Sequence, residues 1–87
     1  MIDNQELQRF ETTENGHLVF VNYRTHDGRY VLTHAEADPE IRGKGAAARL
    51  MEAITAHARA NNFKLVPRCS YALDWFARHP EASDLIG

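Results

Sequence analysis

The chain lacks most of the features that stabilise a small protein from outside its core or attach it to a charged or lipid partner. Cysteine occurs once in 87 residues, at Cys69, so no intramolecular disulfide can form. The longest aliphatic or aromatic run, Leu18–Val21, is far short of the roughly 20 residues that cross a bilayer. Ten Lys and Arg against twelve Asp and Glu give a net charge of −2, which argues against nucleic acid and against an anionic membrane as partners.

Nothing in the composition divides the chain. Stretches rich in Pro, Gly or Ser, long charge blocks and internal repeats are all missing, so residues 1–87 are expected to form one domain. The polar, acidic start Met1–Glu6 differs from a secretory signal, which favours a cytoplasmic protein. The five histidines and Cys69 show no spacing typical of a zinc site, and we expect no metal.

The first half of the chain has the pattern of strands. Weak strand character at Leu7–Thr13 is followed by Asn15-Gly16, a pair suited to a tight hairpin, and then by the β-branched and aromatic segment His17–Arg24. Asp27-Gly28 marks a second turn before Arg29–Glu36. This pattern predicts an antiparallel meander of three strands. The middle strand is apolar on both faces, so a second layer or a ligand is expected to cover its second face.

After Asp38-Pro39 the hydrophobic period changes from two to 3.6, which predicts a helix over about Gly45–Ala60. Asn61-Asn62 provides its stop. Its buried stripe is Ala47, Leu50, Met51, Ile54 and Ala58. Phe63–Val66 has strand composition, and a strand that follows such a crossover is normally parallel to the strand before the helix.

A last helix is predicted over Ser70–Arg78, with Ser70 as N-cap and Leu73, Phe76 and Ala77 facing inward. His79-Pro80 ends it. The expected fold is therefore an α/β (α+β) arrangement in the order β-β-β-α-β-α, an antiparallel meander plus a parallel fourth strand, with the helices packed on the sheet.

The segment Glu40–Ala47 carries the clearest chemical signal, because it lies between a strand and the start of a helix. Unpaired N–H groups at a helix start attract anions, and glycines let a phosphate approach the backbone. Arg42 and Lys44 add positive charge. The segment fits neither a P-loop nor a dinucleotide-binding fingerprint. From the residues alone, a phosphate site and a solvated turn are equally good interpretations.

Arg42-Gly43-Lys44-Gly45-Ala46-Ala47 fits the signature of the GNAT acetyltransferases, which is Arg or Gln, two residues, Gly, one residue, then Gly or Ala. Leu32-Thr33-His34, Val66–Tyr71 and Arg78–Glu81 extend the match. The chain resembles this family, and in particular its small YjdJ-type branch, over most of its length from Leu32 onward.

The resemblance implies a minimal GNAT-like fold with acetyl-CoA as co-substrate. By resemblance, the pyrophosphate is held by the loop, the pantetheine arm by the end of the third strand, and Ser70 and Tyr71 also contact the cofactor. The implied cofactor-binding residues are Ala35, Glu36, Ala37, Arg42, Gly43, Lys44, Gly45, Ala46, Ala47, Ser70 and Tyr71. The chain is too short for the N-terminal elements that wall the acceptor site of larger relatives, so the acceptor side is expected to be open. The acceptor is expected to be a primary amine of unknown identity, on a small molecule or a protein.

Cys69 and His34 correspond to the cysteine and histidine proposed as catalytic in that branch. The third and fourth strands should be neighbours, so their ends could bring both side chains to one cleft. A helix start favours a thiolate at Cys69, and His34 would act as general base. The structural alternatives are inert packing for Cys69 and a satisfied strand histidine for His34.

Two aromatic residues remain open at this level. Tyr71 either protonates the departing CoA thiolate, as a tyrosine near this place does in larger relatives, or packs against the first helix. Trp75 either covers the sheet edge or packs against the adenine of the cofactor.

Three functions compete on the sequence alone. The first is acetyl transfer to a primary amine, directly or through an acetylated Cys69. The second is an acyl-CoA-binding module without turnover. The third is a protein-interaction domain, which explains the Gly-rich loop poorly.

Overall fold

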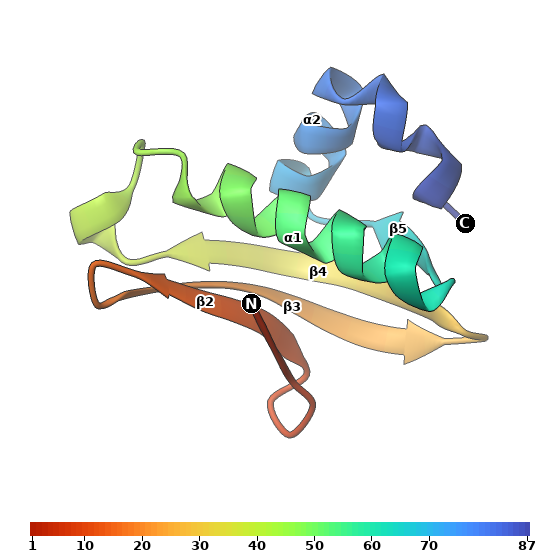
Figure 1. The fold of residues 1–87 in the computed structure, drawn as a ribbon, viewed down its shortest axis with the longest axis horizontal. Helices are drawn as coiled ribbons and strands as arrows, with labels where there is room; N and C mark the ends of the chain where they lie inside the picture. Colours follow the sequence, from red (N-terminus) through yellow and green to blue (C-terminus); the bar gives the residue numbers. More distant parts are fainter.

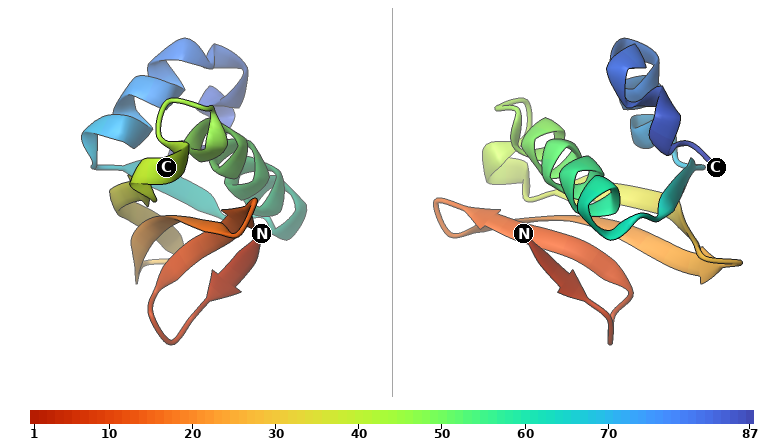
Figure 2. Two further views of the ribbon diagram at one scale, coloured as in Figure 1. Left: turned by 90° about the vertical axis from the view of Figure 1, so that its left-hand side faces the viewer. Right: turned by 45° about the vertical axis from the view of Figure 1, so that its right-hand side comes forward.

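A twisted five-stranded sheet carries both helices on one of its faces (Figures 1 and 2). The computed structural model describes residues 1–87. The strands are β1 (Ile2–Asn4), β2 (Arg9–Glu14), β3 (His17–His26), β4 (Arg29–Ala37) and β5 (Lys64–Pro67). The helices are α1 (Ala46–Asn61) and α2 (Ser70–Arg78), with short 3-10 helices η1 (Pro39–Ile41) and η2 (Pro80–Leu85). Neither helix is long and apolar enough to span a membrane.

The predicted order of strands and helices is confirmed. Strands β1 to β4 are antiparallel neighbours in chain order, and β5 joins β4 in parallel after the α1 crossover. Both predicted hairpin turns have positive φ at their two central residues, 52° and 79° at Asn15-Gly16 and 50° and 75° at Asp27-Gly28. These angles match the right-handed twist of the strands that they join.

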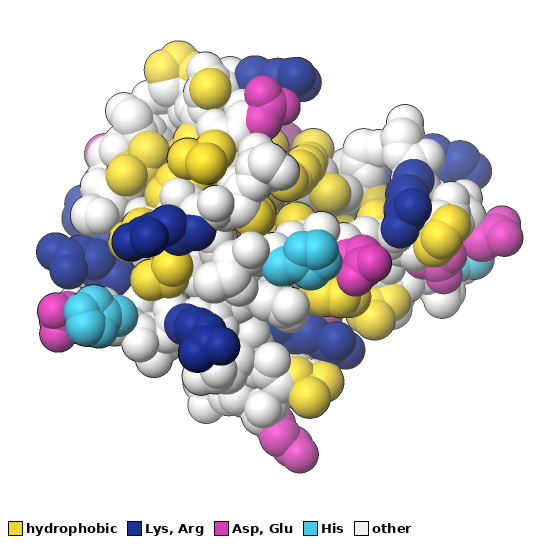
Figure 3. Space-filling view, turned by 180° about the vertical axis from the view of Figure 1, so that it is seen from behind, with side chains coloured by type: hydrophobic (Ala, Val, Ile, Leu, Met, Phe, Trp, Pro, Cys, Tyr) yellow, Lys and Arg dark blue, Asp and Glu magenta, His cyan; other side chains and the backbone are white.

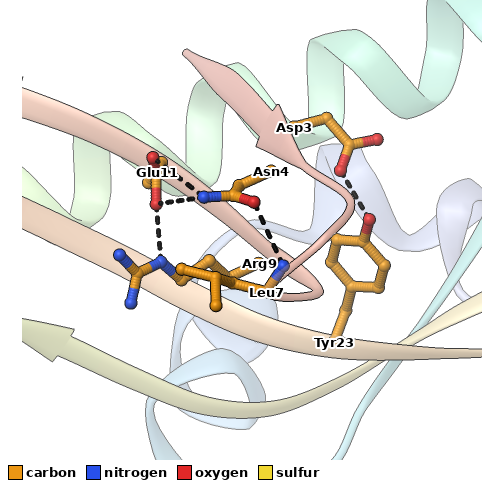
Figure 4. A network of polar contacts seen from close by, with 6 residues as sticks. All are labelled: Asp3, Asn4, Leu7, Arg9, Glu11 and Tyr23. Carbon is orange, nitrogen blue, oxygen red and sulfur yellow. Dashed lines mark hydrogen bonds and ion pairs between the residues drawn. The ribbon is translucent and has the colours of Figure 1, made fainter.

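A short N-terminal strand, β1, extends the sheet beyond the predicted meander. It pairs with β2, and side chains on both of its faces form hydrogen bonds with the rest of the sheet (Figure 4). The Tyr23 hydroxyl donates to the Asp3 carboxylate at 2.5 Å on the helix side of the sheet. On the other side, the Asn4 side-chain amide donates to Glu11. Three residues are too few to show a strand period, which is why the pattern of the sequence missed β1.

Helix α1 covers the middle of the sheet, as its apolar stripe predicts. Leu50, Met51 and Ile54 are fully buried against the inner face of the sheet. The helix begins after Gly45 and ends at Asn61. Its C-cap, Asn62, adopts the left-handed conformation (φ 58°) and donates its N–H to the Ala58 carbonyl. The predicted start and stop are thus correct to within one or two residues.

The orientation of α2 differs from the prediction. Leu73 is 51% exposed and Ala77 is also exposed, whereas Ala72, Trp75 and Phe76 are buried. Of the predicted inward face, only Phe76 is confirmed. The N-cap is Cys69 instead of Ser70, because the Cys69 sulfur accepts the Ala72 N–H at 3.4 Å. A helix of nine residues has too few apolar positions to define its inner face from periodicity alone.

A β-bulge in β4 decides which side chains face the helices. Asn22 pairs with His34 and Tyr23 with Leu32, so Thr33 is the extra residue. Without the bulge, His34 would share the buried face of Leu32. With the bulge, Ala35 lies on the helix side, opposite buried Val21, and His34 turns to the other face.

The face opposite the helices is open. Leu18 and Phe20 of β3 lie there and are half-buried, because alternation places them opposite Val19 and Val21 of the core. The helices cover one face of the middle strand, β3. No second layer of protein covers its other face.

Candidate functional site

Strands β4 and β5 diverge in the middle of β4. Their pairing ends at Leu32 and Pro67, and the amides of Arg68 and Cys69 both donate to the Leu32 carbonyl, at 2.9 and 3.1 Å. Beyond this point β4 continues to Ala37 with no strand on that side. The two parallel strands therefore diverge, and the divergence leaves a free backbone edge on β4.

The free edge exposes specific peptide groups. The Asp38 N–H donates to the Leu18 carbonyl on β3. Because peptide groups alternate in direction along a strand, those of Ala35 and Ala37 point the other way, toward the side that β5 has left. The Ala37 carbonyl accepts the Arg42 Nε–H at 3.0 Å. The peptide groups of Ala35 face the same free edge.

The loop between β4 and α1 presents the start of α1 to the same place. The Asp38 carboxylate accepts the Glu40 N–H and begins η1. Gly43 and Gly45 follow with φ of 77° and 83°, a region that favours glycine. Gly45 is the N-cap of α1, and no side chain caps the helix there. The N–H groups of the first turn are therefore available to a ligand.

A cleft of about 390 Å³ lies between the free edge, the loop and α2. Seen from behind, the molecule is hollowed between two raised parts, with hydrophobic side chains at the bottom of the hollow (Figure 3). The residues that line the cleft are Ala35, Glu36, Ala37, Ile41, Arg42, Gly43, Gly45, Ala46, Ala47 and Tyr71. Nine of these ten were expected to contact a cofactor on the basis of the family resemblance.

Four expected site residues lie outside this lining. Lys44 belongs to the loop, and Ser70 is the first residue of α2. Cys69 is half-buried, with its sulfur at the N-terminus of α2. His34 is on the open face, where its Nε2 lies 3.5 Å from Glu36 Oε2. The Cys69 and His34 side chains form no hydrogen bond with each other, because the bulge at Thr33 turns His34 away from the helix side.

Tyr71 and Trp75 have different surroundings. Burial raises the pKa of the Tyr71 phenol, with smaller opposing effects of Arg78 and Asp74, so its proton stays on at neutral pH. Trp75 does not line the cleft. It is only 6% exposed and its ring stacks on His79 at a centroid distance of 4.0 Å.

Two residues that the sequence pattern did not single out shape the loop. Ile41 is buried and forms a wall of the cleft. Arg49 donates to the Lys44 carbonyl at 2.8 Å and to both oxygens of the Glu14 carboxylate. The sequence did contain a signal for Ile41, because it is an isolated apolar residue in a polar loop. The contact of Arg49 with Glu14 spans 35 positions and leaves no local signal.

The comparisons with known proteins agree with this geometry. The family model described as GCN5-related N-acetyl-transferase matches residues 9–85. A solution NMR structure of a GCN5-like candidate N-acetyltransferase from Staphylococcus aureus is similar in fold, with a TM-score of 0.68 and 22% identity, and the match covers 88% of this chain and 86% of that one. No curated protein matches the chain. The chain therefore belongs to the GCN5-related N-acetyltransferase family.

Proposed function

We propose that the protein transfers an acetyl group from acetyl-CoA to a primary amine. The observation that carries the proposal is the position of the free edge of β4 beside the uncapped start of α1. One cleft thus offers a strand edge for an amide-containing arm and a helix N-terminus for phosphates. A CoA ester has both parts, joined in that order.

Each part of the cleft suits one part of acetyl-CoA. The glycines at 43 and 45 leave the loop backbone accessible, and no atom lies within 4 Å of a Cβ position at Gly43. Arg42 and Lys44 add positive charge beside the phosphates. The peptide groups of Ala35 and Ala37 match the amides of the pantetheine arm.

The chemistry needs two proton movements. The thioester supplies an activated acetyl group. As the amine nitrogen bonds to the acetyl carbon, the carbon–sulfur bond breaks, the amine loses a proton and the sulfur gains one. We assign the first proton to His34, which lies two residues beyond the last residue of β4 that pairs with β5, Leu32. We assign the second to the Tyr71 phenol, which lines the cleft.

The role of Cys69 remains a prediction. A thiol at a helix start suits a nucleophile, and its half-buried capping position equally suits a structural role. Direct attack by the amine needs no covalent intermediate on Cys69, and we favour the direct route. The resemblance to the YjdJ-type branch likewise stays a prediction.

A module that binds acyl-CoA without turnover is the second candidate. It is favoured by the position of Cys69 and His34 outside the cleft lining. The deciding experiment incubates the protein with acetyl-CoA and a panel of primary amines, and follows free CoA thiol together with the mass of each amine. We expect thiol release that requires an amine and one acetyl mass on that amine. CoA binding without release for any amine would favour the module.

A further inference from the structure

The open face of the sheet is basic at the end where β3 turns into β4. In Figure 3, Lys and Arg side chains gather on the left, over this end of the sheet. The pairing of the strands shows how such side chains are brought together. His26 pairs with Arg29, and Arg29 pairs in turn with Lys64. One row across β3, β4 and β5 therefore carries three basic residues side by side.

The next row on the same face adds a further basic residue and two valines. Side chains two positions apart along a strand share a face. Arg24 pairs with Val31, and Val31 pairs with Val66, so these three lie beside the first row. The row between them contains the fully buried Leu65 and faces the helices. We call the six residues of the two outer rows the basic surface: Arg24, His26, Arg29, Val31, Lys64 and Val66.

The three permanent cations of the basic surface have no carboxylate partners. Arg24, Arg29 and Lys64 take part in none of the ion pairs of the structure. Lys64 Nζ donates to the backbone carbonyl of Asp84, but the Asp84 carboxylate pairs with Arg59 at 2.6 Å. A chain whose net charge is −2 thus gathers three unpaired cations at one end of one face.

The basic surface has an apolar centre and a charged, exposed rim. Its four basic residues are exposed, whereas Val31 and Val66 are half-buried next to each other. Both helices lie on the opposite face of the sheet, so neither covers the two valines. An apolar centre inside a polar rim is the usual composition of a protein docking surface. Here the rim is positive, so it complements a ligand with carboxylates around an apolar side chain.

The chemistry of the basic surface favours a peptide over a nucleic acid. The bases of a single strand bind by stacking on aromatic rings, and the surface contains no Phe, Tyr or Trp. Tyr30, which lies between the two rows, packs against buried Phe10 on the helix side. A longer polyanion would also continue along the open face toward Glu36, which is half-exposed and repels phosphates. A short acidic peptide avoids this repulsion.

We propose that the basic surface is a docking site for an acidic peptide segment of a partner protein. The carboxylates of the segment contact the three cations, and an apolar side chain between them packs on Val31 and Val66. The segment is not an acetyl acceptor, because its contacting groups are carboxylates and aliphatic carbons instead of amines. The inference therefore goes beyond the proposed function and does not depend on it.

The basic surface and the cleft lie on different halves of β4. Arg29 and Val31 precede Leu32, where the pairing of β4 with β5 ends. The free edge that lines the cleft begins only beyond Leu32. A docked segment thus leaves the cleft accessible, and it holds the partner protein beside the cleft.

The test is an NMR titration of the ¹⁵N-labelled chain at low salt with two capped nine-residue peptides, one of three Glu-Val-Glu repeats and one of three Gln-Val-Gln repeats. We expect the acidic peptide to shift the amides of the basic surface and to bind more tightly than the neutral one. Binding should weaken as NaCl is added, because salt screens exposed charges.

Charge-removing variants locate the contact. Arg24→Gln and Arg29→Gln should each weaken binding of the acidic peptide about three-fold. Both residues are exposed, so the fold should be retained, which circular dichroism checks. Arg78→Gln is the matched control, because it removes the same charge from α2, where Arg78 lies 3.1 Å from Asp74. It should leave binding unchanged.

Four results would overturn the inference. The first is equal binding of the acidic and the neutral peptide. The second is a set of shifts confined to another surface, such as the loop before α1. The third is unchanged binding of the acidic peptide by both Arg24→Gln and Arg29→Gln. The fourth is tighter binding of a nine-nucleotide oligothymidine than of the acidic peptide, which would make this a nucleic-acid surface. None of these results bears on acetyl transfer, since no CoA is present.

Discussion

The Arg49 guanidinium donates two hydrogen bonds to the Glu14 carboxylate, at 2.8 and 2.6 Å. It thereby joins the first turns of α1 to the β2–β3 hairpin. The same guanidinium donates to the Lys44 carbonyl. The hydrogen bonds between the two side chains lower the pKa of Glu14 and raise that of Arg49. The loop that we assign to the CoA phosphates is thus braced from the hairpin.

Loss of this brace should weaken CoA binding more than it weakens the fold. Arg49→Ala frees the Lys44 carbonyl and the loop, so we expect a lower affinity for CoA in calorimetry and a small drop in Tm. Arg59→Ala is the matched control, because Arg59 makes a similar pair with Asp84 near the other end of α1. Equal CoA affinity in the two variants would show that Arg49 does not support the site.

Gly45→Ala should impair CoA binding for a different reason. The Gly45 φ of 83° is unfavourable for any side chain, and a Cβ there would lie 2.9 Å from Arg49 Nη1. Gly28→Ala is the control, since Gly28 has a φ of 75° in a turn with open space around it. Both variants should lose stability from backbone strain, on the order of 1 kcal/mol. Only Gly45→Ala should lower CoA affinity, and an equal effect of Gly28→Ala on affinity would argue against the loop.

The core and the surface of the helices should respond differently to truncation. Leu50 lies on the inner face of α1 and is 1% exposed. Leu50→Ala should lower the free energy of unfolding by about 2 to 5 kcal/mol, measured by chemical denaturation. Leu73→Ala on the exposed side of α2 should change stability by only about 0.5 kcal/mol. A large effect at Leu73 would mean that α2 is rotated from the position described above.

The Arg59–Asp84 pair should make part of the stability depend on pH. Hydrogen bonds from Arg59 lower the pKa of Asp84 in the folded state. Their contribution is therefore present above the ordinary aspartate pKa of 3.8 and is lost as the pH falls through the folded value. Asp84→Asn should lower Tm at pH 7, and the difference from the wild type should disappear by about pH 2. A difference that is constant with pH would contradict this interpretation.

Cys69 is best tested by two substitutions. Cys69→Ser retains a side chain that can cap α2, and Cys69→Ala removes both the cap and the thiol. If the thiol is only structural, Cys69→Ser should keep the acetyl-transfer rate, and Cys69→Ala should lose stability alone. Loss of transfer in a folded Cys69→Ser protein, together with an acetyl adduct on wild-type Cys69, would favour the covalent route.

The sequence predicted the parts of the fold that depend on local pattern. It predicted the two glycine-containing turns, the buried stripe of α1 with Leu50, and the glycine-containing loop before α1. Each of these is encoded by residues that are close together in the sequence. The structure differs from the prediction where a very short element or a contact between distant residues determines the local conformation. The bulge at Thr33 places His34 on the open face, and no local pattern signals a bulge. The inner face of α2 was predicted wrongly because a helix of nine residues has too few apolar positions to define it.

The central claim is that the loop before α1 and the free edge of β4 together bind acetyl-CoA. An NMR titration of the ¹⁵N-labelled chain with CoA tests it most directly. The account predicts saturable shifts concentrated at the amides of Gly43, Gly45, Ala46 and Ala47 and at Ala35–Ala37, with β1 and the β3–β4 turn unaffected. Absence of shifts at millimolar CoA, or shifts confined to residues outside the cleft, would contradict it.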